Sequence, residues 1–220
     1  MTDFAAQRRM MVDGQVRTAD VTDLRLLAAM LELPRERFFP DEKASLAYLD
    51  LDAPVSAPGQ PVRRLLKPMV LAKLIQTAGI AATDRVLDVG CASGYSTALL
   101  SHLAGSVVGL EEDAALARQA ADTMSWAGPT AKIVTGPLAR GCVGEGPYDV
   151  ILLQGSAEVV PPALFDQLKN GGRLVGVVGR GPQGKAMFYR RADGDFSGRP
   201  VFDAAAGALP GFAKPPEFVF

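Results

Sequence analysis

The chain has 220 residues and a mass of 23.2 kDa, a length that favours a single domain. Hydrophobic residues make up 48% and charged residues 21%, a composition that excludes an intrinsically disordered protein. The formal net charge of -1 argues against a nucleic-acid groove and against a surface for anionic lipid.

Two features of the sequence indicate a cytoplasmic protein. Its two cysteines, Cys91 and Cys142, are too few for a disulfide framework, and we expect both to be free thiols. The first residues lack a basic segment with an apolar stretch behind it, and no apolar run reaches the roughly 18 residues that a membrane span needs. We therefore expect no membrane partner, and the sequence leaves the oligomeric state open.

Residues 1–80 are expected to form a helical cap followed by a substrate loop. Thr22 is a candidate N-cap for a helix with apolar residues at helical spacing, and Pro34 ends that helix. Prolines and a glycine then mark an extended loop over 53–62. Pro68 is suited to the first position of another helix, which Gly79 ends. We expect these helices to lie against or over the ligand edge of a sheet.

Strands and helices alternate over 81–182, the expected cofactor-binding core. The predicted strands are 85–89, 107–110, 132–134, 148–153 and 173–178, and the predicted helices are 95–104, 114–124 (after a possible Asp113 cap) and about 161–171. Residues 183–220 are expected to form a hairpin, with one antiparallel strand at an edge, and a tail. The pattern predicts an α/β fold: a doubly wound, mostly parallel, Rossmann-like seven-stranded sheet.

A glycine-rich turn, Gly90 to Gly94, follows the first predicted strand. In such sheets ligands bind beyond the carboxyl ends of the strands, near the first turn. Gly90 allows a tight turn, and Gly94 allows a helix N-terminus to approach a ligand closely. Glu111 ends the second strand, where an acidic side chain meets ribose hydroxyls in nucleotide-binding sheets. The turn is therefore a candidate nucleotide site.

Two cofactor classes and one plain alternative fit this turn. A dinucleotide site requires G-x-G-x-x-G, but Ala92 replaces the middle glycine and the last spacing differs. An S-adenosylmethionine site has an acidic residue just before the turn, facing the cationic amino group of the methionine part, and Asp88 has that place. The alternative is a βα turn with a surface aspartate. We favour the S-adenosylmethionine site because Asp88, Gly90, Gly94 and Glu111 occur together.

The segment 86–97, Val-Leu-Asp-Val-Gly-Cys-Ala-Ser-Gly-Tyr-Ser-Thr, resembles the first motif of the protein-L-isoaspartate O-methyltransferase family, which has a class I S-adenosylmethionine-dependent fold. The resemblance continues through 147–152 and 168–178. It also includes the N-terminal segments 11–17 and 33–38, which other methyltransferase families lack. It implies a single methyltransferase domain that methylates side-chain carboxylates of isoaspartyl residues in damaged proteins, a repair reaction.

The resemblance also implies a cofactor and the residues that bind it. The cofactor is S-adenosylmethionine and the product is S-adenosylhomocysteine. Glu111 is expected to bind the ribose diol, and the residues of the turn are expected to line the methionine and ribose parts. The implied cofactor-binding residues are Asp88, Gly90, Cys91, Ala92, Ser93, Gly94, Glu111, Glu112, Gly136, Pro137, Leu138 and Gln154.

The sequence departs from the family pattern at two places. The family's substrate loop carries Thr-hydrophobic-Ser-x-Pro, whereas residues 63–67, Arg-Arg-Leu-Leu-Lys, offer no hydroxyl before Pro68. The family's Gly-Asp after the third strand, which binds the adenine amino group, is Gly136-Pro137 here. Losing one such hydrogen bond weakens binding by about 0.5–1.5 kcal/mol. Either Arg63, Arg64 or Lys67 draws an acceptor carboxylate to the cofactor in place of the serine, or these cations form a solvated basic loop.

The expected reaction needs few catalytic groups. A carboxylate acceptor with a pKa near 4 is already ionised at pH 7, so no general base is required. The protein must align the reactants and exclude water. The single histidine, His102, has no companion ligand, so no metal is expected. Two functions remain open: the methyltransferase, acting on a protein or peptide carboxylate, and a drifted family member that binds S-adenosylmethionine or a protein partner without isoaspartyl methylation.

Overall fold

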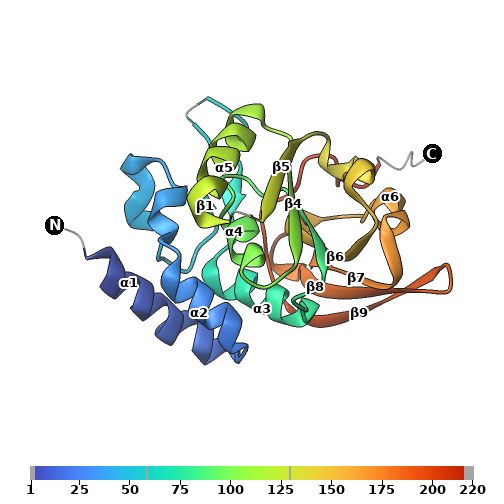
Figure 1. Ribbon diagram of the computed structural model, residues 1–220, viewed down its shortest axis with the longest axis horizontal. Helices are drawn as coiled ribbons and strands as arrows, with labels where there is room; N and C mark the ends of the chain where they lie inside the picture. The colour runs from blue at the N-terminus through green and yellow to red at the C-terminus, as the bar shows by residue number, and fades with distance from the viewer. Residues whose placement is uncertain (1–2, 58, 129, 216–220) are drawn as a thin grey trace.

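The computed structural model describes residues 3–57, 59–128 and 130–215. A seven-stranded sheet has the order β5-β4-β3-β6-β7-β8-β9 (Figure 1). Its first five strands along the chain are parallel, and the last two are antiparallel to their neighbours. The strands are β3 (Arg85–Val89), β4 (Ser106–Glu111), β5 (Ala131–Thr135), β6 (Tyr148–Ala157), β7 (Leu168–Val178), β8 (Lys185–Ala192) and β9 (Asp195–Asp203). The predicted fold class is confirmed, with an antiparallel pair of strands where one edge strand was expected.

Alternating side chains of the strands build two hydrophobic cores, one on each face of the sheet. Val86 of β3 lies in one core, while its neighbour Leu87 lies in the other. Three helices, α3 (Pro68–Ala78), α4 (Tyr95–Ser101) and α5 (Ala114–Ala127), cover the first face, and α6 (Pro162–Asp166) covers part of the second (Figure 1). The second core is completed by tail residues Leu209 and Phe212.

The N-terminal helices form a further layer on α3 and α4, and Arg35 and Phe38 of that layer pack against Tyr95, the residue after the glycine-rich turn. Helix α2 buries Leu26, Leu27 and Met30 among other helices, because its apolar stripe needs an apolar partner that the polar edge does not offer. The layer contains α1 (Phe4–Met11), η1 (Val12–Val16), η2 (Arg17–Ala19), α2 (Leu24–Glu32), η3 (Arg35–Phe38) and η4 (Asp41–Leu46). Two short antiparallel strands follow, β1 (Ala53–Pro54) and β2 (Arg64–Leu65).

Several predicted helix boundaries are correct and others are not: α4 ends at Ser101, short of residue 104, and α5 continues past residue 124 to Ala127. Pro68 begins α3, Gly79 ends it in a left-handed conformation, and Asp113 caps α5. The N-cap of α2 is Asp23, not Thr22, because the Asp23 carboxylate accepts hydrogen bonds from the first backbone N–H groups of the helix. Helix α6 ends at Asp166 instead of near residue 171, since β7 already begins beside β6 at Leu168.

The chain order of the strands places a crevice at the carboxyl end of β3. From β3 the chain moves outward through β4 to β5, and then returns to the opposite side of β3 as β6. Ligands of open α/β sheets bind at such a switch point. Among the described residues, no helix is both long and apolar enough to cross a bilayer.

Candidate functional site

The turn after β3 brings the backbone close to two other segments of the chain. Gly90 has a φ of +80°, and a Cβ on it would lie 2.7 Å from Nη2 of Arg63. Gly94 has a φ of +94°, and a Cβ there would lie 3.1 Å from side chains of α5. A side chain at either position would be strained and crowded. Ser93 Oγ is buried in the turn and has no hydrogen-bond partner within the described parts of the chain, so it is available to a polar ligand.

Asp88 is fully buried at the end of β3, below the turn. Its Oδ2 accepts hydrogen bonds from the hydroxyls of Ser96 and Thr97, and its Oδ1 accepts one from Nε2 of Gln154, each at 2.6 Å. Burial raises the pKa of Asp88 to about 6, although these three hydrogen bonds favour the ionised form. A cationic ligand group near Asp88 would stabilise the ionised carboxylate and lower its pKa again.

Glu111 lies at the end of β4 with its side chain fully buried. Three backbone N–H groups donate to its carboxylate, from Ala92 at 2.7 Å, Glu112 at 2.9 Å and Asp113 at 3.1 Å. These bonds fix the carboxylate beside the turn, where the sequence predicts a ribose-binding group. Both oxygens also accept from Arg63, through Nε at 3.2 Å and Nη2 at 3.1 Å.

The three candidate acceptor-binding cations do not form one cluster. Arg63 is buried on Glu111 and also donates to the Gly90 carbonyl at 3.1 Å. Arg64 is exposed, and its Nη1 donates to the Asp52 carbonyl. At Lys67 the backbone N–H donates to Oδ1 of Asp52 at 2.9 Å. Thus Arg63 reaches the turn, whereas the interactions of Arg64 and Lys67 tie the loop to Asp52.

The C-terminal tail also reaches this edge, which the sequence did not predict. Pairing of β3 with β6 ends at Val89 and Leu153, and further along β6 the tail takes the neighbouring place through a bridge between Ser156 and Ala208. The N–H of Ser156 donates to the Gly207 carbonyl at 2.8 Å, and the N–H of Leu209 donates to the Ser156 carbonyl at 2.9 Å. The tail therefore lies in the crevice of the switch point.

Arg63, which donates to the Gly90 carbonyl, lines two hollows. The larger, of about 580 Å³, is also lined by Glu111, Glu112 and Pro210. The smaller, of about 100 Å³, is also lined by Arg64 and Gln154. The larger hollow thus lies at Glu111, and the smaller lies at Gln154, the residue that donates to Asp88.

The remaining predicted cofactor residues fall into two groups. Glu112 and Gln154 line the hollows. Leu138 is buried and packs toward Gly90, while Cys91 Sγ is directed toward β4 beside Gly109, and burial raises the pKa of the Cys91 thiol. Neither Gly136 nor Pro137 lines the larger hollow. Ser96 and Thr97, which donate to Asp88, were not among the predicted site residues. Two adjacent hydroxyl side chains at the start of α4 are the sequence feature that could have indicated them.

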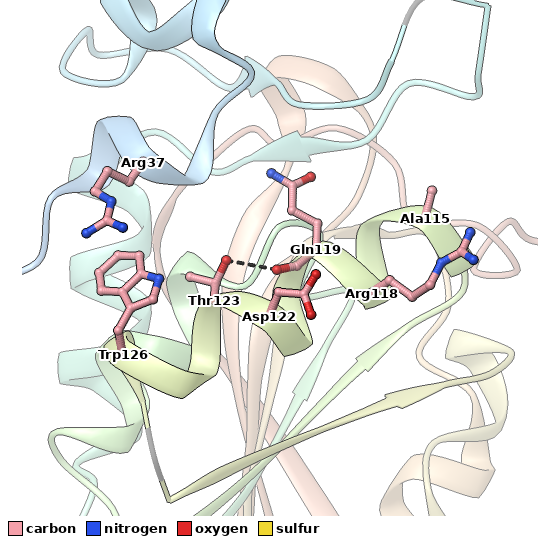
Figure 2. A pocket seen from close by; sticks show the side chains of 7 residues that line it. All are labelled: Arg37, Ala115, Arg118, Gln119, Asp122, Thr123 and Trp126. Carbon is pink, nitrogen blue, oxygen red and sulfur yellow. Dashed lines mark hydrogen bonds between the residues drawn. The ribbon is translucent and has the colours of Figure 1, made fainter.

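A third hollow, of about 550 Å³, lies on the outer face of α5 (Figure 2). The Arg37 guanidinium stands 3.9 Å from the centre of the Trp126 ring, and Arg118 and Asp122 line the hollow along the helix. Ala115 lines both this hollow and the larger hollow at Glu111. Its lining contains no residue of the turn.

The sequence matches one protein family over most of its length. Residues 6–205 match the family described as protein-L-isoaspartate(D-aspartate) O-methyltransferase. A protein-L-isoaspartate O-methyltransferase of Koribacter versatilis is 38% identical over 87% of this chain and 84% of its own length. One of Opitutus terrae is 39% identical over 79% of this chain and 73% of its own length.

Two solved structures named as protein-L-isoaspartate O-methyltransferases have the same fold as this chain. One protein-L-isoaspartate O-methyltransferase superposes with a TM-score of 0.80 at 23% identity, over 94% of this chain and 66% of its own. A second, from Plasmodium falciparum in complex with S-adenosyl-L-homocysteine, has a TM-score of 0.76 at 19% identity, over 95% of this chain and 99% of its own. At these identities the likeness concerns the arrangement of the elements.

Proposed function

Because the chain belongs to the protein-L-isoaspartate(D-aspartate) O-methyltransferase family, we propose that it transfers a methyl group from S-adenosylmethionine to the side-chain carboxylate of isoaspartyl residues in proteins. The observation that carries the proposal is the Glu111 carboxylate, buried at the carboxyl end of β4 and aimed at the turn. We infer a repair role in the cytoplasm, a location supported by the two free thiols, Cys91 and Cys142.

The polar groups of the site fit the cofactor. Glu111 offers two oxygens to a ribose diol, and Asp88 offers a buried anion to the ammonium group of the methionine part. The unpartnered hydroxyl of Ser93 offers a further hydrogen bond. The cofactor supplies an electrophilic methyl group on a positively charged sulfur.

The acceptor is expected to enter through the smaller hollow. Arg64 lines this hollow, and its exposed guanidinium can pair with an incoming carboxylate. Gln154, on the same hollow, holds Asp88 and so connects the acceptor side with the cofactor side. An ionised acceptor needs no base from the protein, so the task of these residues is to orient it and to exclude water.

The test uses two peptides that differ only in one linkage, isoaspartyl in one and ordinary aspartyl in the other. With S-adenosylmethionine we expect methyl ester on the isoaspartyl peptide alone, detected by mass spectrometry together with an equal amount of S-adenosylhomocysteine. Arg64→Ala is expected to raise KM for the peptide severalfold, while Arg190→Ala, an exposed arginine on β8, leaves it unchanged. Binding of S-adenosylhomocysteine without ester on either peptide would contradict the proposed acceptor.

A further inference from the structure

Arg63 occupies the place that the proposed function assigns to the ribose. Its guanidinium makes a two-point contact with both oxygens of Glu111, and the two side chains are 6% and 0% exposed. Planar guanidinium groups match carboxylates in this geometry, and buried pairs of this kind persist unless another partner replaces one member. A ribose diol needs the same two oxygens.

Leu209 occupies the crevice next to Arg63. Its side chain is buried, and its Cδ2 lies 2.8 Å from the position that a Cβ on Gly90 would take. Its Cγ lies 2.8 Å from the corresponding position on Gly155. The side chain thus covers the carboxyl ends of β3 and β6, at Gly90 and Gly155.

Asp52 connects the loop that carries Arg63 with the tail that carries Leu209. Its Oδ1 accepts from the N–H of Lys67 at 2.9 Å, and its Oδ2 accepts from the N–H of Gly207 at 3.2 Å. Residues 155 positions apart are therefore held by one carboxylate. Displacement of the loop at Lys67 would therefore disturb a contact of the tail at Gly207.

We propose that Arg63 and Leu209, here called the blocking pair, close the nucleoside site, and that cofactor binding replaces the Arg63–Glu111 ion pair with hydrogen bonds from the ribose. This inference rests on the proposed function. Glu111 keeps its three backbone donors after Arg63 leaves, so its charge stays satisfied. Release of the loop and tail then opens the acceptor side, which makes cofactor binding the first step.

The blocking pair lowers the affinity for the cofactor, since a closed site reduces apparent affinity by the fraction of open molecules. We expect Arg63→Gln to bind S-adenosylhomocysteine at least about tenfold more tightly in calorimetry. Leu209→Ala should also bind more tightly, and it leaves the Arg63–Glu111 pair in place. Arg190→Gln, at an exposed arginine on β8 outside both segments, is the matched control and should not change affinity.

Hydrogen exchange provides a second readout. In the unaltered chain, S-adenosylhomocysteine should raise amide exchange in 59–65 and 204–212 while lowering it in 88–97. Arg63→Gln should show the raised exchange without ligand. Binding to the unaltered chain and to both variants with equal affinity, with exchange falling in all three segments, would overturn the blocking pair and leave the proposed function standing. Failure of all three proteins to bind would overturn both.

Discussion

The turn at 88–97 and the segments that cover it are built in different ways. In the turn, Asp88 and the hydroxyls that hold it lie within ten residues of sequence, and the strand before them sets their direction. The covering segments, 52–57 with 59–65 and 204–212, meet through contacts such as that between Asp52 and Gly207. The difference teaches that local sequence sets the turn and the hydroxyls that hold Asp88, whereas only the complete fold brings the covering segments together.

Both regions meet at one carboxylate. Glu111 accepts from the backbone of the turn through Ala92 and from the loop through Arg63. Substitutions can therefore be chosen that affect both regions, one of them, or neither. The expected effects decrease in that order.

Glu111→Gln affects both regions and should have the largest effect. It leaves the Arg63 guanidinium buried without its anion, and breaking a buried pair in this way costs about 3–5 kcal/mol of unfolding free energy. Urea denaturation measures this loss, and calorimetry should show that binding of S-adenosylhomocysteine is lost as well. Glu112→Gln, at the exposed neighbour, is the control for stability. A double variant that also carries Arg63→Gln should recover part of the stability, and no recovery would show that the pair is not the cause.

Asp88→Asn affects the turn and should weaken cofactor binding and remove one pH-dependent contribution to stability. The pKa of Asp88 rises from 3.8 to about 6 on folding, so at neutral pH the ionised side chain opposes folding, by up to about 3 kcal/mol at 1.36 kcal/mol per pH unit. The folded state binds the extra proton between about pH 4 and pH 6, so this contribution makes stability fall as pH rises through that range.

The stability of Asp88→Asn relative to the unaltered chain should therefore rise with pH between about pH 4 and pH 6 and stay constant on either side of that range. Urea denaturation at a series of pH values measures it. Ser106→Ala, at a partly buried position at the start of β4, is a control without a titrating group. A difference that does not depend on pH would contradict the assigned titration.

The sequence predicts the turn because every element of it leaves a local signal. A short β-rich run, two glycines and a helix start are enough to place Asp88, Gly90 and Gly94, and the end of the next strand places Glu111. The predicted set of cofactor residues remains a prediction, but its members at 88–94 and 111–112 lie around one crevice. Because β3 and β4 are parallel neighbours, their carboxyl ends lie side by side at the same edge of the sheet.

The sequence does not predict the position of Arg63 or of the tail. Three cations in one loop have the same local pattern whether they face solvent or a carboxylate on a distant strand. Arg63 is buried because Glu111 is there to pair with it, 48 residues later in the chain. Leu209 belongs to a segment without helical or strand periodicity, and its pairing with Ser156 exists only because β3 ends before β6 does.

Gly155→Ala affects the tail alone. The new Cβ would lie 2.7 Å from the Gly207 carbonyl oxygen and 2.8 Å from Cγ of Leu209, so the tail must shift. Overpacking of this kind costs about 1–3 kcal/mol, and urea denaturation should show it. Exchange should rise in 204–212 and stay unchanged in 88–97. Gly144→Ala, where nothing lies within 4 Å, is the control. Unchanged exchange in the tail would mean that the tail tolerates the added methyl group without moving.

Arg37→Ala affects neither region and should have the smallest effect. Arg37 stacks on Trp126 at the outer face of α5, and an exposed cation–π contact contributes about 0.5–1 kcal/mol to stability (Figure 2). Thermal denaturation should show a loss of this size, and Arg118→Ala, at an arginine that lines the same hollow on α5, should show less. The affinity for S-adenosylhomocysteine should not change in either variant. A change in affinity with Arg37→Ala would show that the hollow on α5 communicates with Glu111, to which it is joined at Ala115, and that the site extends beyond the turn and its covering segments.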